Sequence, residues 1–161
     1  MKNKEFEIVT HPDKRLRKKS LVVSKEELAK KETQALILAM ADVMIEKDGV
    51  GLAAPQIGIQ KRIVIIFTKD GPLSLINPKI IKNSWRKETD EEGCLSVPNT
   101  YGNVKRSYKI TVTALSLKGK KVEFIAQGLF ARIIMHEVDH LDGVLFIDKA
   151  KKLRHLSAEV L

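Results

Sequence analysis

Five consecutive residues, His136-Glu137-Val138-Asp139-His140, carry the clearest chemical pattern in the sequence, an HExxH motif. On an α-helix, residues four apart lie one above the other, so both imidazoles point toward a single metal ion. The carboxylate of Glu137 lies beside them and can take a proton from water at that metal. Such strings also occur by chance, and helical histidines are often plain surface residues. The flanking helix is apolar, however, and burying these polar groups without partners is costly, which favours a metal site.

Two histidines leave the coordination of a metal incomplete. His155 lies in the polar tail without a local motif, whereas Cys94 is the only thiol of the chain. One thiolate and two imidazoles form a reasonable three-ligand set that leaves a fourth position for water. The alternative is that Cys94 is a small buried hydrophobic residue, the commonest fate of a free cysteine. Gly93 and Pro98 near it favour a loop or a sheet edge over a core strand.

A third segment, GVGLAAPQ at residues 49–56, combines small residues with one amide. Small residues let the backbone of a ligand come close, and Gln56 offers a hydrogen-bond donor. A tight connection after a helix explains this segment equally well.

The elements that must position these segments can be read from the same sequence. Ser24 and Glu27 have the spacing of a capping box, and we expect a helix from there toward Asp48, with Gly49 as its left-handed stop. A second helix is expected over residues 129–141, closed by Gly143. It carries the HExxH motif on an otherwise apolar sequence.

The strands are predicted from apolar runs and from alternation. Residues 62–67 form an apolar run typical of a buried strand. Pro72 and Asn77-Pro78 predict turns in the next connection, which leads to a further strand at 79–82. Residues 110–114 and 122–126 alternate and predict a hairpin. The fold class is α+β: mostly antiparallel β-sheets around the central HExxH helix, with a longer helix in the N-terminal half, in a single domain over residues 1–161.

Composition limits the class of protein further. The 161 residues are 43% hydrophobic and 30% charged, and no apolar run approaches the length of a membrane span. The N-terminus does not resemble a secretory signal, so we expect a cytoplasmic protein, or an organellar one if a eukaryotic transit peptide was trimmed. A single cysteine excludes an intrachain disulfide. The net charge of +9 is spread along the chain without an RNA-binding aromatic motif. It is read as solvated surface, with no sequence-specific nucleic acid partner and room for a weak attraction to the ribosome.

Taken together, GVGLAAPQ, EGCLS (92–96) and HEVDH (136–140) resemble, in order, the three signature motifs of the peptide deformylases. The resemblance covers most of the chain from about Ile8 to Asp148. It implies an enzyme that removes the N-formyl group from the formyl-methionine of new proteins, so the expected partners are N-formylmethionyl peptides.

The resemblance also implies roles for individual residues. The metal ligands are Cys94, His136 and His140. Glu137 takes the proton of the attacking water and passes it to the leaving amine, while the Gln56 amide and the Leu95 N–H stabilise the oxyanion. The substrate pairs with the backbone around Val50, Gly51 and Gly93. Its methionine side chain enters a pocket for which Leu95, Leu129 and Ile133 are candidates. Glu92 and Asp139 are candidates for orienting the metal ligands.

The same resemblance points to one divalent ion, Fe(II) in the cell, although zinc, nickel and cobalt also accept one sulfur and two nitrogen donors. An exposed Fe(II)–thiolate would make oxidation of Cys94 a route of inactivation. Two positions depart from the family pattern: Met135 stands where glutamine is usual, and Arg132 where a small or apolar residue is expected. Both predict a methionine pocket with an altered rim or depth.

Two other functions stay open at this point. One is a different HExxH hydrolase, such as an aminopeptidase or endopeptidase. The other is a non-catalytic metal-binding or ribosome-associated module, against which the intact Glu137 and Gln56 argue.

Overall fold

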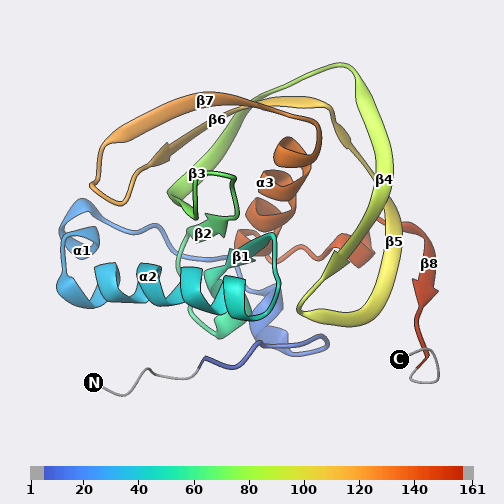
Figure 1. Cartoon of the computed structure of the whole chain (residues 1–161), viewed down its shortest axis with the longest axis horizontal. Coiled ribbons are helices and arrows are strands. Elements are labelled where there is room, and N and C mark those ends of the chain that lie inside the picture. The colour runs from blue at the N-terminus through green and yellow to red at the C-terminus, as the bar shows by residue number, and fades with distance from the viewer. Residues whose placement is uncertain (1–5, 158–161) are drawn as a thin grey trace.

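Two antiparallel sheets enclose a central helix in the computed structural model, which describes residues 6–157 (Figure 1). The central helix is α3 (Gly128–Leu141), and the longer α2 (Lys31–Glu46) covers the other side of the larger sheet. This is the α+β class predicted from the sequence, with the HExxH motif on α3. No helix in this part of the chain is long and apolar enough to cross a membrane.

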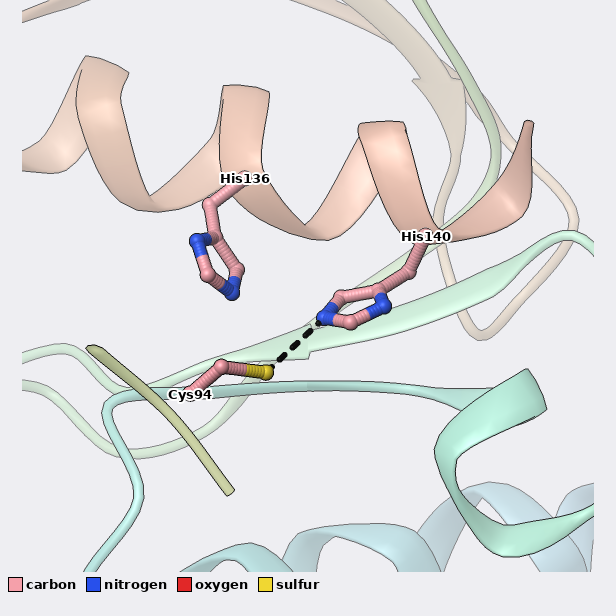
Figure 2. A group of neighbouring side chains, drawn as sticks. All are labelled: Cys94, His136 and His140. Atoms are coloured by element: carbon pink, nitrogen blue, oxygen red, sulfur yellow. Dashed lines mark hydrogen bonds between the residues drawn. The ribbon is translucent and has the colours of Figure 1, made fainter. Parts of the chain in front are cut away.

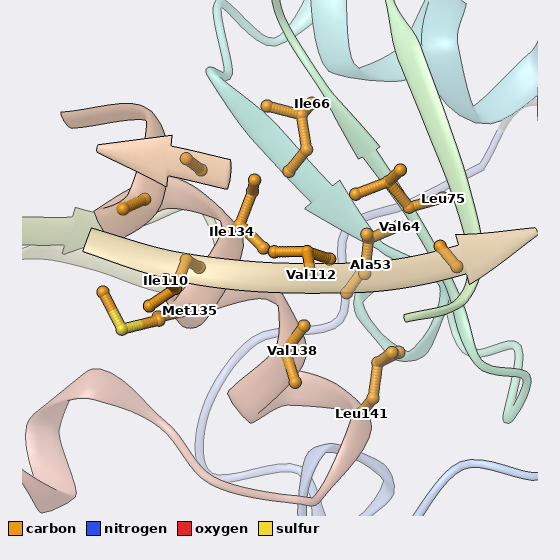
Figure 3. Close-up of a cluster of buried hydrophobic side chains, with 13 residues drawn as sticks. Ala53, Val64, Ile66, Leu75, Ile110, Val112, Ile134, Met135, Val138 and Leu141 are labelled. Carbon is orange, nitrogen blue, oxygen red and sulfur yellow. The ribbon is translucent and has the colours of Figure 1, made fainter. Parts of the chain in front are cut away.

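The larger sheet has five strands in the order β1-β2-β3-β6-β7, all antiparallel. Their bounds are β1 Gly51–Ala53, β2 Ile63–Ile66, β3 Leu73–Asn83, β6 Lys109–Leu115 and β7 Lys121–Gln127. Side chains alternate between its two faces. On β2, Val64 and Ile66 pack toward α3 (Figure 3), whereas Ile63 and Ile65 pack toward α2. Burial on both faces explains why this strand is a continuous apolar run.

The smaller sheet has the order β4-β5-β8, with β4 at Lys87–Cys94, β5 at Val97–Ser107 and β8 at Lys151–His155. The sequence analysis missed all three strands. β4 reads KETDEEGC and buries only Glu92, so it lacks an apolar alternation from which a strand can be predicted. A two-residue turn joins β4 to β5, with an irregular register between Gly93 and Cys94.

The prediction of one helix from Ser24 toward Asp48 is wrong. Ser24 does cap a helix, accepting a hydrogen bond from the Glu27 N–H at 3.0 Å, but α1 ends at Leu28 (Lys25–Leu28). The Gln34 side chain donates a hydrogen bond to the Leu28 carbonyl at 2.7 Å. This carbonyl would otherwise accept a backbone N–H of a continuing helix. The left-handed residue after α2 is Asp48, with φ 53°, instead of Gly49.

The pair Asn77-Pro78 was also misplaced, because it lies inside β3 and not in a connection. Asn77 has φ 51°, and the register to β6 shifts between Ile76 and Lys79. A bulge of this kind accommodates a proline, which cannot donate to the ladder. The predicted strand 79–82 is thus the second half of β3. The hairpin β6–β7 and the positive φ of Gly143 (73°) are as predicted.

Candidate metal centre and active site

The two faces of α3 separate packing from chemistry. Ile134, Val138 and Leu141 are buried against the five-stranded sheet (Figure 3). His136 and His140 leave the helix on another side and point toward Cys94 on the smaller sheet (Figure 2). Packing of the apolar face holds the helix in place, and the helical repeat sets the spacing of the two imidazoles.

Cys94, His136 and His140 form one compact group, with one potential ligand atom from each lying within 4.8 Å of the others. The Cys94 sulfur lies 3.2 Å from Nε2 of His140 (Figure 2). Nδ1 of His136 lies 2.9 Å from the Glu92 carboxylate, which leaves its Nε2 for the centre of the group. Cys94 is half-buried at the end of β4, a sheet edge as the sequence indicated.

The charge environment of this group suits a cation. Burial lowers the pKa of His140 well below its usual value, with His136 and Arg106 acting in the same direction, so the imidazole is neutral as a ligand must be. Burial also lowers the pKa of His136, but the nearby Cys94 sulfur and Glu92 carboxylate outweigh it and raise the pKa well above its usual value. Positive charge is therefore favoured between these groups, and the donor set fits a divalent metal.

Glu92 is the centre of a buried ion network behind His136. Arg106 donates to both of its oxygens, at 2.6 and 2.9 Å, and Arg132 donates to one at 2.8 Å. Burial raises the pKa of Glu92, but the hydrogen bonds from Arg106 and His136 reverse this and hold the pKa at about 2. The carboxylate stays ionised and fixes the orientation of the His136 ring.

Glu137 lies beside the metal-ligand group and is almost completely buried. Its Oε2 has no hydrogen-bond partner among the described residues. Burial raises its pKa to about 7, against the opposing effect of His136. The side chain lies over Gly51, where an added Cβ would come within 2.5 Å of Oε1. A side chain at position 51 would therefore force this carboxylate to move.

Gln56 is buried in the short helix η2 (Ala54–Ile57) and is held at both ends of its amide. Its oxygen accepts a hydrogen bond from the Ala53 N–H at 2.8 Å. Its nitrogen lies 3.2 Å from the Ser96 hydroxyl and 3.5 Å from the Cys94 sulfur. The amide N–H groups are thus directed toward the metal-ligand group.

A cavity of about 430 Å³ opens onto these groups. All the residues predicted to bind substrate line it, namely Val50, Gly51, Gly93, Leu95, Leu129 and Ile133. Gln56, Cys94, His136 and Glu137 line it as well. Its outer part includes Asp48, Glu91 and Tyr101, none of which the sequence analysis singled out.

Three other predictions need correction or refinement. Met135 packs into the core against the sheet and does not line the cavity. Arg132 does line it, but its guanidinium is bound to Glu92 and to the carbonyls of Val104 and Glu88, so it does not project into the pocket as a free charge. Asp139 contacts no metal ligand directly.

Asp139 instead pairs with Arg106 and Lys149, each at 2.9 Å. Arg106 and the Ser96 hydroxyl are the site residues to which the sequence analysis gave no role. Both are buried polar groups on the β4–β5 hairpin. Ser96 ends the EGCLS motif, which does not reveal its contact with Gln56, and no local pattern marked Arg106.

A thiol and two imidazoles close enough to share one ion, beside a buried carboxylate that lines a cavity, are typical of a metal-dependent hydrolase. The comparisons with known proteins then give the family. The chain belongs to the polypeptide deformylase family, whose model matches residues 5–155. Members are hydrolases that remove the N-formyl group from formylmethionyl peptides, and the chain is an enzyme of this kind. This decides against the aminopeptidase and the non-catalytic module.

Two curated relatives match over about nine tenths of their own length. The peptide deformylase of Desulforudis audaxviator is 44% identical over 146 residues, 90% of this chain and 93% of the relative. Peptide deformylase 1 of Clostridium acetobutylicum is 50% identical over 137 residues, 85% of this chain and 89% of the relative.

Solved structures agree with the sequence relatives. The class I type b peptide deformylase of Acinetobacter baumannii, with Met-Ala-Ser bound, superposes with a TM-score of 0.86 at 37% identity, covering 89% of this chain and 97% of that one. The Thermotoga maritima peptide deformylase gives 0.86 at 38% identity, with 91% and 97% covered. The Synechococcus elongatus peptide deformylase in complex with actinonin gives 0.87 at 38% identity, with 94% and 82% covered.

Proposed function

We propose that this enzyme deformylates new proteins with a divalent ion held by Cys94, His136 and His140. The observation that carries the proposal is the convergence of these three ligand atoms within 4.8 Å, next to the unpartnered carboxylate of Glu137. Such an ion would supply Lewis-acid polarisation of the formyl carbonyl and acidify a water molecule. Fe(II) is the proposed ion in the cell, by resemblance to the family; zinc, nickel and cobalt also suit one sulfur and two nitrogens.

Glu137 is the proposed general base and general acid. Its Oε2 accepts the proton of the water that attacks the formyl carbon, and later delivers that proton to the nitrogen of the leaving amine. The products are formate and a free N-terminus. The contact with Gly51 supports this assignment, because it holds the carboxylate close to the ligands without a competing hydrogen bond to Oε2.

The proposed oxyanion donors are the Gln56 amide and the Leu95 N–H. The hydrogen bonds from Ala53 to the oxygen of Gln56 and from its nitrogen to Ser96 fix the amide before substrate arrives. A donor held in place in this way needs no reorganisation during the reaction. Loss of one such donor typically costs roughly 3 kcal/mol of transition-state stabilisation.

For the substrate we propose an extended peptide that runs between Val50–Gly51 on one side and Gly93 on the other, in the manner of an added strand. Its methionine side chain would lie against Leu95, Leu129 and Ile133. The support is that all these residues line the one cavity that holds Glu137. The bound Met-Ala-Ser in the Acinetobacter baumannii relative has the corresponding product-like sequence. Because new proteins are the substrates, the proposed location is the cytoplasm.

The experiment that tests the mechanism is formate release from formyl-Met-Ala-Ser by Fe(II)-loaded protein kept free of oxygen. Glu137→Gln keeps the shape of the side chain and removes the base, so we expect formate release to fall by about 100- to 10,000-fold. Metal content per chain should stay unchanged. Asp142→Asn is the matched control, since it removes a carboxylate at the exposed end of the same helix. Full activity in Glu137→Gln would refute the assignment.

A further inference from the structure

A fully exposed tryptophan lies at the corner between β3 and β4, on the sequence Ser84-Trp85-Arg86. Trp85 is 100% exposed and is the only tryptophan in the chain. The corner is held to the neighbouring β5–β6 corner by backbone hydrogen bonds, from Ser84 N–H to the Lys109 carbonyl at 2.8 Å and from Tyr108 N–H to the Arg86 carbonyl at 2.9 Å. Single exposed apolar side chains are common on protein surfaces, so this indole becomes informative only together with the charged residues near it.

Basic side chains surround this tryptophan. Lys82, Arg86 and Lys87 lie within three residues of it in the chain, and Lys109 reaches the same corner from β6. All four are exposed. Arg86 pairs with Glu88, whereas the three lysines have no carboxylate within ion-pair distance anywhere in residues 6–157. Three uncompensated cations beside an open aromatic ring attract a flexible anion with flat groups.

A second aromatic ring and a guanidinium complete the surface. The guanidinium of Arg86 lies over the ring of Tyr108, 4.0 Å from its centroid. Stacking of this kind fixes the guanidinium, which also pairs with Glu88, so the charge available to a phosphate comes from the three lysines. Single-stranded nucleic acid offers both complements, because its bases stack on exposed aromatic rings and its phosphates pair with lysine and arginine.

We propose that this surface, made by Trp85, Arg86, Lys82, Lys87 and Lys109 and here named the Trp85 corner, binds single-stranded RNA without sequence preference. Its one exposed indole lies on a strand corner and not on an amphipathic helix, which argues against a membrane surface as the partner. The choice of RNA over other single strands rests on the proposed function, since new proteins appear next to ribosomal RNA. The binding test itself does not involve hydrolysis.

The corner is connected to the active site. The Tyr108 carbonyl accepts a hydrogen bond from the Gly128 N–H at 2.7 Å, at the first residue of α3. The next residue, Leu129, lines the cavity. RNA bound at the Trp85 corner would therefore lie near the N-terminus of α3, whose second residue lines the cavity.

The single tryptophan makes the test direct. Decauridylate titrated into the metal-loaded enzyme at low salt should quench the Trp85 fluorescence to saturation, with an affinity that falls steeply as salt increases. With labelled decauridylate and anisotropy as the readout, Trp85→Ala should bind at least about tenfold more weakly, whereas Trp85→Phe keeps most of the affinity. An absence of quenching at low salt would overturn the proposal. So would quenching by vesicles of anionic phospholipid without any by RNA.

A charge-reversal pair separates the corner from the general positive charge of the chain. Lys109→Glu should weaken RNA binding about tenfold and lower the slope of log affinity against log salt by about one. Lys118→Glu makes the same charge change in the turn between β6 and β7, at the opposite end of the hairpin, and should bind like the unmodified enzyme. Equal losses of RNA affinity in both variants would refute the Trp85 corner as the binding site. Formate release shows that each variant is folded, and loss of RNA binding does not bear on the deformylase mechanism.

Discussion

The two sides of the metal centre are held in place by opposite kinds of interaction. The histidines come from α3, whose buried face is apolar where it meets the five-stranded sheet. The cysteine comes from the β4–β5 hairpin, which reaches α3 through the ion network of Glu92, Arg106 and Arg132. One side is positioned by packing alone, and the other by buried charge together with a smaller apolar cluster that includes Val97 and Val104.

This difference sets how each side responds to damage. Aliphatic packing loses stability gradually, in proportion to the volume removed. A buried ion network behaves otherwise, because removal of one partner leaves a charge that is neither solvated nor paired. The stability of the Cys94 side should therefore respond more strongly to a single substitution than that of the α3 side.

The largest effect is expected for Arg106→Met, which removes the partner shared by Glu92 and Asp139. Breaking a buried pair typically costs 3–5 kcal/mol, and we expect about 3 kcal/mol because Arg132 and His136 still contact Glu92. Urea unfolding of the metal-loaded protein would measure it. A loss below about 1 kcal/mol would mean that the network adds little and that packing holds both sides.

A smaller effect is expected on the α3 side. Ile134→Val removes one methylene from a fully buried side chain that faces the sheet, which should lower the free energy of unfolding by about 1 kcal/mol. Metal content and formate release should be unchanged, because the helix keeps its other contacts. If this conservative change released the metal, the helix side would be the more sensitive one and the comparison would be reversed.

The smallest effect is expected for Arg154→Met, the exposed counterpart of Arg106→Met. Arg154 pairs at 3.0 Å with Glu91, the residue directly before Glu92, but both side chains are about half exposed. Exposed pairs contribute roughly 0–1 kcal/mol, so unfolding in urea should barely change. Because Glu91 and Glu92 are neighbours, a difference in stability loss between the two arginine variants would identify burial as its cause. Similar losses of unfolding free energy in both variants would show that burial is not decisive.

Much of the α3 side could be predicted from the sequence, and little of the hairpin side. The apolar period of α3 and the alternation of β6 and β7 are local patterns, so their elements were predicted within a residue or two. β4 has no such pattern, since its single buried residue is a glutamate whose partners lie 14 and 40 residues away. Pairing at that distance leaves no trace in the local sequence.

The same limit explains why the contacts of Arg132 were not foreseen, although it does line the cavity. An arginine on an apolar helix, one turn before a metal ligand, seemed to alter the methionine pocket. Its guanidinium instead joins α3 to Glu92 and to the backbone of both strands of the hairpin. The site residues that lie in contiguous motifs could be named from the sequence, whereas those that act through tertiary contacts, such as Arg106, could not.

Gly51 has a consequence for how this enzyme can change during evolution. An added methyl group there would overlap the Glu137 side chain and force it to shift. Most positions in a protein tolerate drift until stability runs out. At position 51 a single substitution displaces the carboxylate that we propose as the proton carrier, so we expect selection at this site to act on turnover before it acts on folding.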